Sequence, residues 1–130
     1  MVYWITGKKN SGKTTLAYRL KELLEGYGES VVILDGDEIR NEFPIGYSDI
    51  ERWGRTYEIG KWAVVFEKQG VIPIIALLSE KKEWRERTRE LFNKSKLIYL
   101  PGGDEPEGVV YEVPDEEEMG KGRGGNEKWG

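Results

Sequence analysis

The residues best suited to chemistry lie near the amino terminus, where two glycines separated by four residues precede a lysine and a hydroxyl residue. The segment reads Gly7-Lys-Lys-Asn-Ser-Gly-Lys-Thr14. Glycines let successive backbone N–H groups curl around phosphate oxygens, while such a lysine reaches the β and γ phosphates and such a threonine ligates Mg²⁺. The spacing therefore predicts a nucleotide-binding loop with Thr14 as a metal ligand. The predicted nucleotide contacts are Gly7, Lys8, Lys9, Asn10, Ser11, Gly12, Lys13, Thr14 and Thr15.

Two carboxylates follow the next apolar run of the chain. Asp35 and Asp37 come directly after Val31-Val-Ile-Leu34. The carboxyl ends of parallel strands collect ligands at one edge of a sheet, so both side chains are predicted to lie beside the phosphate loop. We assign Asp35 to Mg²⁺ and Asp37 to a base or orienting role at an acceptor hydroxyl. A second interpretation has Asp37 only capping a helix that begins near Glu38.

The elements around these residues alternate between strands and helices. The strand-like runs are continuously apolar instead of alternating in polarity, which is typical of a parallel sheet covered on both faces. We therefore predict an α/β fold with about four to five parallel strands and helices on both faces. The expected strands are 2–6, 31–34, 71–78, 97–100 and a further edge strand at 108–113; the expected helices are 16–24, 49–68 and 80–93.

Composition limits the chemistry and the organisation of the chain. The 130 residues contain no cysteine and no histidine, which excludes disulfides, thiolate or imidazole catalysis and the usual zinc ligand sets. Residues 1–100 hold 17 Lys or Arg against 15 acids, whereas residues 101–130 hold 3 against 9. We expect a domain over 1–117 and a flexible glycine-rich tail over 118–130. No apolar run approaches the ~18 residues of a membrane span, and a cytoplasmic protein is expected.

Several blocks together resemble one enzyme family, the adenylylsulfate kinases among the P-loop kinases. The resemblance extends over about residues 2–116, and the second and third blocks are much more specific than the phosphate loop. The matching blocks are Gly7 to Thr15, Leu34-Asp-Gly-Asp-x-Ile-Arg40, Gly46-Tyr-Ser-x-x-Glu-Arg52, Gly70 to Ser79 and Tyr111-Glu-Val-Pro114.

The resemblance implies an ATP- and Mg²⁺-dependent kinase with the P-loop NTPase fold. Such an enzyme moves the γ-phosphoryl group of ATP to a hydroxyl of a small anionic acceptor. It implies catalytic roles for Lys13, Asp35 and Asp37, and contacts of Arg40 and Arg52 with the anionic part of the acceptor. The full set assigned to the acceptor is Asp37, Arg40, Arg52, Arg55 and Ser79.

The chain also departs from the family pattern around the acceptor. Arg55 stands where the family has asparagine, and Glu80-Lys81 replaces its Pro-Tyr. The long basic lid segment of the family is reduced to Asp104 to Val110, which contains no Lys or Arg. A lid excludes water and supplies cations, so its loss requires another means of closure. Two alternatives therefore stay open: a kinase acting on a hydroxyl of a nucleic acid, modified base or nucleotide, and a nucleotide-binding module without turnover.

The helix after Ser79 and the aromatic residues before it carry alternative interpretations. The dense charges of 80–90 are typical of a solvated face, although Arg85 or Arg89 could instead face the phosphates and replace a lid cation. Trp53, Tyr57 and Trp62 are interpreted as packing residues in preference to a base-stacking platform. The sequence leaves the oligomeric state open.

Overall fold

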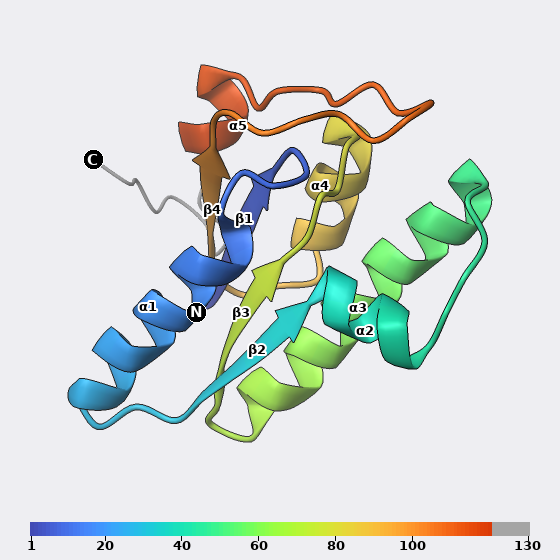
Figure 1. Cartoon of the computed structure of the whole chain (residues 1–130). Coiled ribbons are helices and arrows are strands. Elements are labelled where there is room, and N and C mark those ends of the chain that lie inside the picture. Colours follow the sequence, from blue (N-terminus) through green and yellow to red (C-terminus); the bar gives the residue numbers. More distant parts are fainter. Residues whose placement is uncertain (121–130) are drawn as a thin grey trace.

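The computed structural model describes residues 1–120 and is built on a sheet of four parallel strands (Figure 1). The strand order is β2-β3-β1-β4, so the two central strands come from the first and third positions in the chain. This confirms the predicted parallel α/β architecture. The strands are β1 (Val2–Gly7), β2 (Val31–Asp35), β3 (Ile72–Ala76) and β4 (Ser95–Leu100), and the helices are α1 (Lys13–Gly26), α2 (Gly36–Glu42), α3 (Asp49–Lys68), α4 (Lys82–Arg89) and α5 (Glu116–Gly120).

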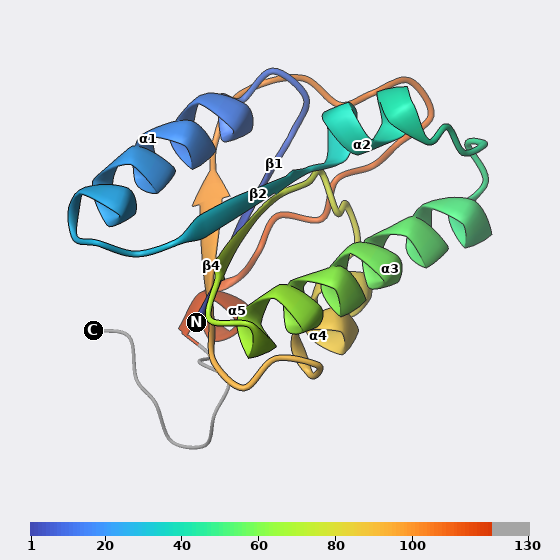
Figure 2. The same ribbon diagram turned by 90° about the horizontal axis from the view of Figure 1, so that it is seen from below.

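Helices cover both faces of the sheet, as the continuously apolar strands require (Figure 2). On one face, Ile5 of β1 packs in a cluster with Ala17 of α1. On the other face, the neighbouring residue Trp4 packs with Ile59 and Ala63 of α3. Successive side chains of a strand point to opposite faces, so β1 serves both halves of the core and is buried in its centre.

The loop edge of the sheet differs from the prediction in two places. The expected helix over 80–93 is shorter, because the chain before it adopts a positive φ of 41° at Ser79 and α4 begins only at Lys82. The expected edge strand over 108–113 is wrong. That segment has no strand structure; Val109 N–H instead closes a turn onto Pro106 O, and Glu112 N–H bonds the loop after β3.

The carboxyl-terminal end of the described chain forms the short helix α5. The segment after β4 crosses the strand ends and doubles back to α5, which packs near β4 (Figure 1). Helix α5 continues past the predicted domain boundary at residue 117, and Glu118 is fully buried. The rest of the predicted tail, 121–130, lies outside the described residues. Within residues 1–120, no helix is both long and apolar enough to cross a membrane.

Two glycines of α3 provide a test of how tightly the helical layer is packed. A Cβ at Gly60 would lie 2.3 Å from Thr88 Cγ2 of α4, whereas a Cβ at Gly54 would meet nothing within 4 Å. Gly60→Ala is therefore expected to lower the free energy of unfolding by about 1–3 kcal/mol through overpacking. Gly54→Ala is expected to raise it by up to about 1 kcal/mol, because alanine is the better helix former. Urea unfolding of both variants measures the difference, and equal stabilities would contradict the close α3–α4 packing.

Candidate functional site

The phosphate loop connects β1 to α1 with the backbone shape that its glycines predict. Gly12 adopts a φ of 99°, and helix α1 begins at Lys13. Its first turn carries neither a side-chain cap nor an acidic residue. The first N–H groups of a helix lack intrahelical partners and carry partial positive charge, so this end of α1 is suited to an anion.

Lys13 is held in place inside the loop that it belongs to. Its Nζ donates to the carbonyl oxygens of Gly7 at 2.9 Å and of Lys8 at 2.8 Å. Burial lowers the pKa of Lys13, and the nearby carboxylates of Asp37 and Asp35 partly offset this effect. The lysine ammonium thus lies between the loop and the two carboxylates that the sequence predicted to be close to it.

Asp35 connects the phosphate loop to the end of β2. Its Oδ2 accepts a hydrogen bond from Thr14 Oγ1 at 2.6 Å, and its Oδ1 accepts from the backbone N–H groups of Asp37 and Glu38. Asp35 is therefore the N-cap of α2, and the alternative that Asp37 caps this helix is wrong. A hydroxyl and a carboxylate in contact provide the oxygen ligands that Mg²⁺ prefers, so this pair fits the predicted metal position.

A cleft of about 560 Å³ opens at the carboxyl ends of the strands. A smaller hollow of about 200 Å³ adjoins it over the phosphate loop, and Lys13, Thr14 and Asp37 line both. The fold thus brings together most of the residues predicted from sequence. The cleft contains Lys9, Lys13, Thr14, Asp35, Asp37, Arg40, Arg52, Arg55 and Ser79, and the hollow contains Asn10, Ser11, Gly12, Lys13, Thr14, Thr15 and Asp37; Gly7 and Lys8 contribute the carbonyls that hold Lys13.

The three arginines at the far side of the cleft have different partners. Arg40 donates to the carbonyl oxygens of Ile45 and Gly46 and lies over the ring of Tyr47, 4.4 Å from its centroid. Arg52 forms an ion pair with Glu80.

Arg55 lies one helical turn beyond Arg52 on α3. It pairs with Glu58 and donates to Phe43 O, while its Nη1 is buried without a hydrogen-bond partner. An unpartnered guanidinium nitrogen costs stability, so a residue in this state at a cleft wall is a suitable anion contact.

The short segment after β4 contributes a wall of the cleft that the sequence did not reveal. Lys9 and Asp104 exchange backbone hydrogen bonds of 2.9 and 2.8 Å, which attach this segment to the phosphate loop. Pro106 and Glu107 line the cleft. Gly103 is required here, since a Cβ on it would lie 2.4 Å from Lys9 O.

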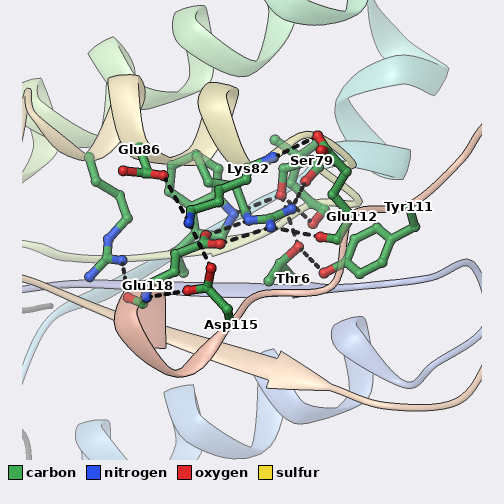
Figure 3. Close-up of polar contacts among 12 residues, drawn as sticks. Thr6, Ser79, Lys82, Glu86, Tyr111, Glu112, Asp115 and Glu118 are labelled. Carbon is green, nitrogen blue, oxygen red and sulfur yellow. Dashed lines mark hydrogen bonds and ion pairs between the residues drawn. The ribbon is translucent and has the colours of Figure 1, made fainter. Parts of the chain in front are cut away.

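Ser79 lies in the cleft wall, but its hydroxyl forms hydrogen bonds with buried side chains. It accepts from Trp4 Nε1 at 3.1 Å and bonds Thr6 Oγ1 at 3.1 Å, and Thr6 in turn contacts the Tyr111 hydroxyl at 2.8 Å. Burial raises the pKa of Tyr111 to about 12. The Tyr111 phenol is therefore protonated at neutral pH and links the carboxyl-terminal segment to β1 (Figure 3).

The interpretation of Arg85 or Arg89 as a lid cation is wrong, and the solvated-face interpretation of this helix holds for Glu83 and Arg87 but not for these two arginines. These side chains are 0% and 3% exposed, so they neither form a solvated face nor point toward the phosphates. The Arg85 guanidinium donates two hydrogen bonds to the Glu118 carboxylate, at 2.6 and 3.0 Å. Arg89 Nε donates to Ser95 Oγ. The reason is that α5 packs near β4 and places the buried Glu118 carboxylate against Arg85.

The packing interpretation of the aromatic residues agrees with the structure. Trp53 stacks on Trp84 of α4 with ring centroids 6.2 Å apart and contacts Tyr57 at 5.2 Å. Trp62 packs against the core cluster of the α3 face. Trp53 therefore helps to join α3 to α4.

The strand order, the phosphate loop at the end of β1 and the carboxylates at the end of β2 define a P-loop kinase-type protein. The family model described as adenylylsulphate kinase matches residues 1–101, and the chain belongs to that family. A probable adenylyl-sulfate kinase of Archaeoglobus fulgidus is 38% identical over 100 residues, covering 75% of this chain and 64% of its own length. An adenylyl-sulfate kinase of Geotalea daltonii is 39% identical, covering 75% and 49% respectively. The chain thus spans about half to two thirds of the length of these relatives.

Solved structures show the same fold. The hexameric APS kinase of Thiobacillus denitrificans superposes with a TM-score of 0.72 at 28% identity, covering 88% of this chain and 23% of that one. The Mycobacterium tuberculosis APS kinase in complex with AMPPNP and APS gives a TM-score of 0.73 at 23% identity, covering 77% and 61%. The predicted P-loop kinase fold is therefore confirmed.

Proposed function

We propose that this protein is an ATP-dependent phosphotransferase that moves the γ-phosphoryl group to a hydroxyl of a small acceptor. The observation that carries the proposal is the shared cleft, in which Lys13, Thr14, Asp35 and Asp37 face the same space as the three arginines. Membership of the adenylylsulphate kinase family supports it, because relatives in that family are named for such a reaction.

Each group at the nucleotide side has a role in this proposal. The phosphate loop and the start of α1 bind the phosphates of ATP, and Lys13 contacts the β and γ phosphates once it leaves the carbonyls of Gly7 and Lys8. Thr14 and Asp35 would hold Mg²⁺, which when bound would neutralise charge that develops on the transferred phosphoryl group.

Asp37 is the proposed catalytic base. Its side chain is exposed to the cleft, unlike the buried Asp35, so an acceptor hydroxyl can reach it. The hydroxyl oxygen forms a bond to the γ phosphorus as the bond to the bridging β–γ oxygen breaks, ADP leaves, and the hydroxyl proton passes to the Asp37 carboxylate.

The acceptor side of the cleft differs from the family pattern, and we propose an altered acceptor pocket without the usual basic lid. Pro106 and Glu107 of the short segment after β4 form part of the wall, and Lys9–Asp104 backbone bonds attach it to the phosphate loop. This segment adds acidic rather than basic side chains. The prediction of a nucleic-acid acceptor gains no support from the matched relatives, whose names specify adenylyl sulfate.

Incubation with γ-labelled ATP and Mg²⁺ over adenylyl sulfate, nucleosides and small hydroxyl compounds tests the proposal. Label on one acceptor is the expected result, whereas ATP binding without transfer to any acceptor would favour a nucleotide-binding module.

Asp37→Asn should lower turnover on that acceptor by about 10²-fold or more, because asparagine cannot take the hydroxyl proton. ATP affinity should change by less than about threefold, since positioning of the phosphates does not depend on this proton transfer. Steady-state transfer rates and calorimetric ATP binding measure the two quantities. Asp49→Asn, an exposed carboxylate in the first turn of α3, is the control. Unchanged turnover in Asp37→Asn would remove Asp37 from the mechanism.

A further inference from the structure

The acceptor side of the cleft contains a buried ion pair. Arg52 Nη2 lies 2.5 Å from Glu80 Oε2, and the two side chains are only 14% and 6% exposed. Both residues line the cleft. The arginine that the family resemblance assigns to an acceptor anion therefore already holds an internal carboxylate.

The backbone around Glu80 is fixed from two sides. Ser79 adopts a φ of 41°, which is unfavourable for a residue with a side chain and persists only where neighbouring contacts impose it. Those contacts come from Arg85, whose Nη1 donates to Ser79 O at 2.7 Å, and from Glu112, whose N–H donates to Glu80 O at 2.7 Å. Figure 3 shows Ser79 and Glu112 joined to the same network of hydrogen bonds, since Arg85 donates to the carbonyl oxygens of both. The Glu80 carboxylate thus projects from a rigid support.

We propose, on the basis of the function proposed above, that Glu80 is the specificity-determining residue of the acceptor subsite. Its carboxylate occupies the anion position at Arg52, so the subsite takes a hydroxyl-bearing acceptor that is uncharged where it meets Arg52. A second anion there would lie beside Glu80 in a partly desolvated site, and like charges placed together are strongly unfavourable.

The partners of Arg40 are different in kind from those of Arg52. Arg40 donates to the neutral carbonyl oxygens of Ile45 and Gly46, and among the described residues it interacts with the Glu51 carboxylate electrostatically without forming a close ion pair. A negative charge on the acceptor is therefore directed to Arg40 and away from Arg52. Glu80 in this way sets where on the acceptor a charge is tolerated.

Two probes that differ in charge test the proposal. Calorimetry compares binding of adenylyl sulfate and of neutral adenosine to the wild type and to Glu80→Gln, each saturated with AMPPNP and Mg²⁺. Any preference of the wild type for adenylyl sulfate should persist in Arg52→Gln, because the negative charge then lies at Arg40 and not at Arg52. Glu80→Gln should bind adenylyl sulfate at least tenfold more tightly than the wild type does, with adenosine unchanged. Glu83→Gln, an exposed carboxylate on α4 that pairs with Arg87, is the matched control and should behave as wild type.

The double variant Glu80→Gln/Arg52→Gln should lose the gained affinity, because the freed arginine is removed together with the carboxylate. Circular dichroism establishes that each variant is folded. If Glu80→Gln does not fold, the double variant is compared with the wild type instead. A wild type with a tenfold preference for adenylyl sulfate that Arg52→Gln abolishes would overturn the proposal, because the anion would then lie at Arg52 beside Glu80. A Glu80→Gln variant that gains nothing, or gains equally for adenosine, would do the same. Binding of AMPPNP and label transfer from ATP are measured separately. Failure of the proposed kinase function is therefore distinguishable from failure of the proposed role of Glu80.

Discussion

Replacing Lys13 with alanine is expected to lower phosphoryl transfer by about 10³-fold and to weaken ATP binding strongly. The change removes an ammonium that is bonded to the phosphate loop and interacts electrostatically with the carboxylates of Asp37 and Asp35. A positioned cation of this kind stabilises charge on the transferring group in a site where water cannot replace it, and loss of one such contact costs about 10²–10³ in rate. ATP binding weakens as well, because Lys13 also contacts the phosphates in the ground state.

Calorimetric ATP binding and transfer from γ-labelled ATP measure the two losses. Lys21→Ala is the matched control, because Lys21 lies on the same helix α1 and is only part of an exposed pair with Glu25. Both variants should melt near the wild-type temperature. Retention of ATP affinity within threefold in Lys13→Ala would contradict the assignment of the phosphate loop.

Replacing Arg85 with methionine is expected to lower the free energy of unfolding by about 3–5 kcal/mol. The substitution leaves the fully buried carboxylate of Glu118 without its partner, and an unpaired buried charge is strongly destabilising. It also removes the hydrogen bonds that Arg85 donates to Ser79 O and Glu112 O. Urea unfolding followed by tryptophan fluorescence measures the loss.

The double variant Arg85→Met/Glu118→Leu should be more stable than Arg85→Met alone, because it removes the buried charge with its partner. Arg87→Met is the control; Arg87 pairs with Glu83 at the surface, where both side chains are more than half exposed, and the change should stay within about 0.5 kcal/mol. A loss below 1 kcal/mol for Arg85→Met would contradict the buried network.

This network gives the end of the described chain a role in the cleft. The family model matches only residues 1–101, yet Glu112 and Glu118 contact the loop that carries Ser79 and Glu80 directly or through Arg85. Tyr111 adds a hydrogen bond to Thr6 at the end of β1. The carboxyl-terminal segment therefore supports the wall of the cleft that contains Ser79 and Glu80.

Local sequence patterns were sufficient to predict the phosphate loop and the parallel sheet. The loop is contiguous in sequence, so the spacing of Gly7, Gly12 and Lys13 already defined which atoms could meet a phosphate. Asp35 and Asp37 could be placed beside it because parallel strands end at one edge. The continuous apolar strands predicted two covered faces, which the structure confirms.

The ion-pair and hydrogen-bond partners of the charged side chains could not be predicted from the sequence. The charges on α4 repeat at spacings that also suit a solvated helix. The carboxylate that pairs with the buried Arg85 belongs to Glu118, 33 residues further along the chain. The same holds for Glu80, which lies in the loop before α4 and pairs with Arg52 of α3. Spacing along one helix reports which residues share a face, but not which distant segment covers that face.

The sequence by itself determined the family, the phosphate-binding loop and the parallel α/β architecture, because these depend on contiguous motifs and on the periodicity of apolar residues. Only the tertiary structure decided that Asp35 caps α2, that 108–113 is a supporting segment and no strand, and that Arg52 and Arg85 are paired with carboxylates. These features depend on segments that meet only after the chain has closed around its core.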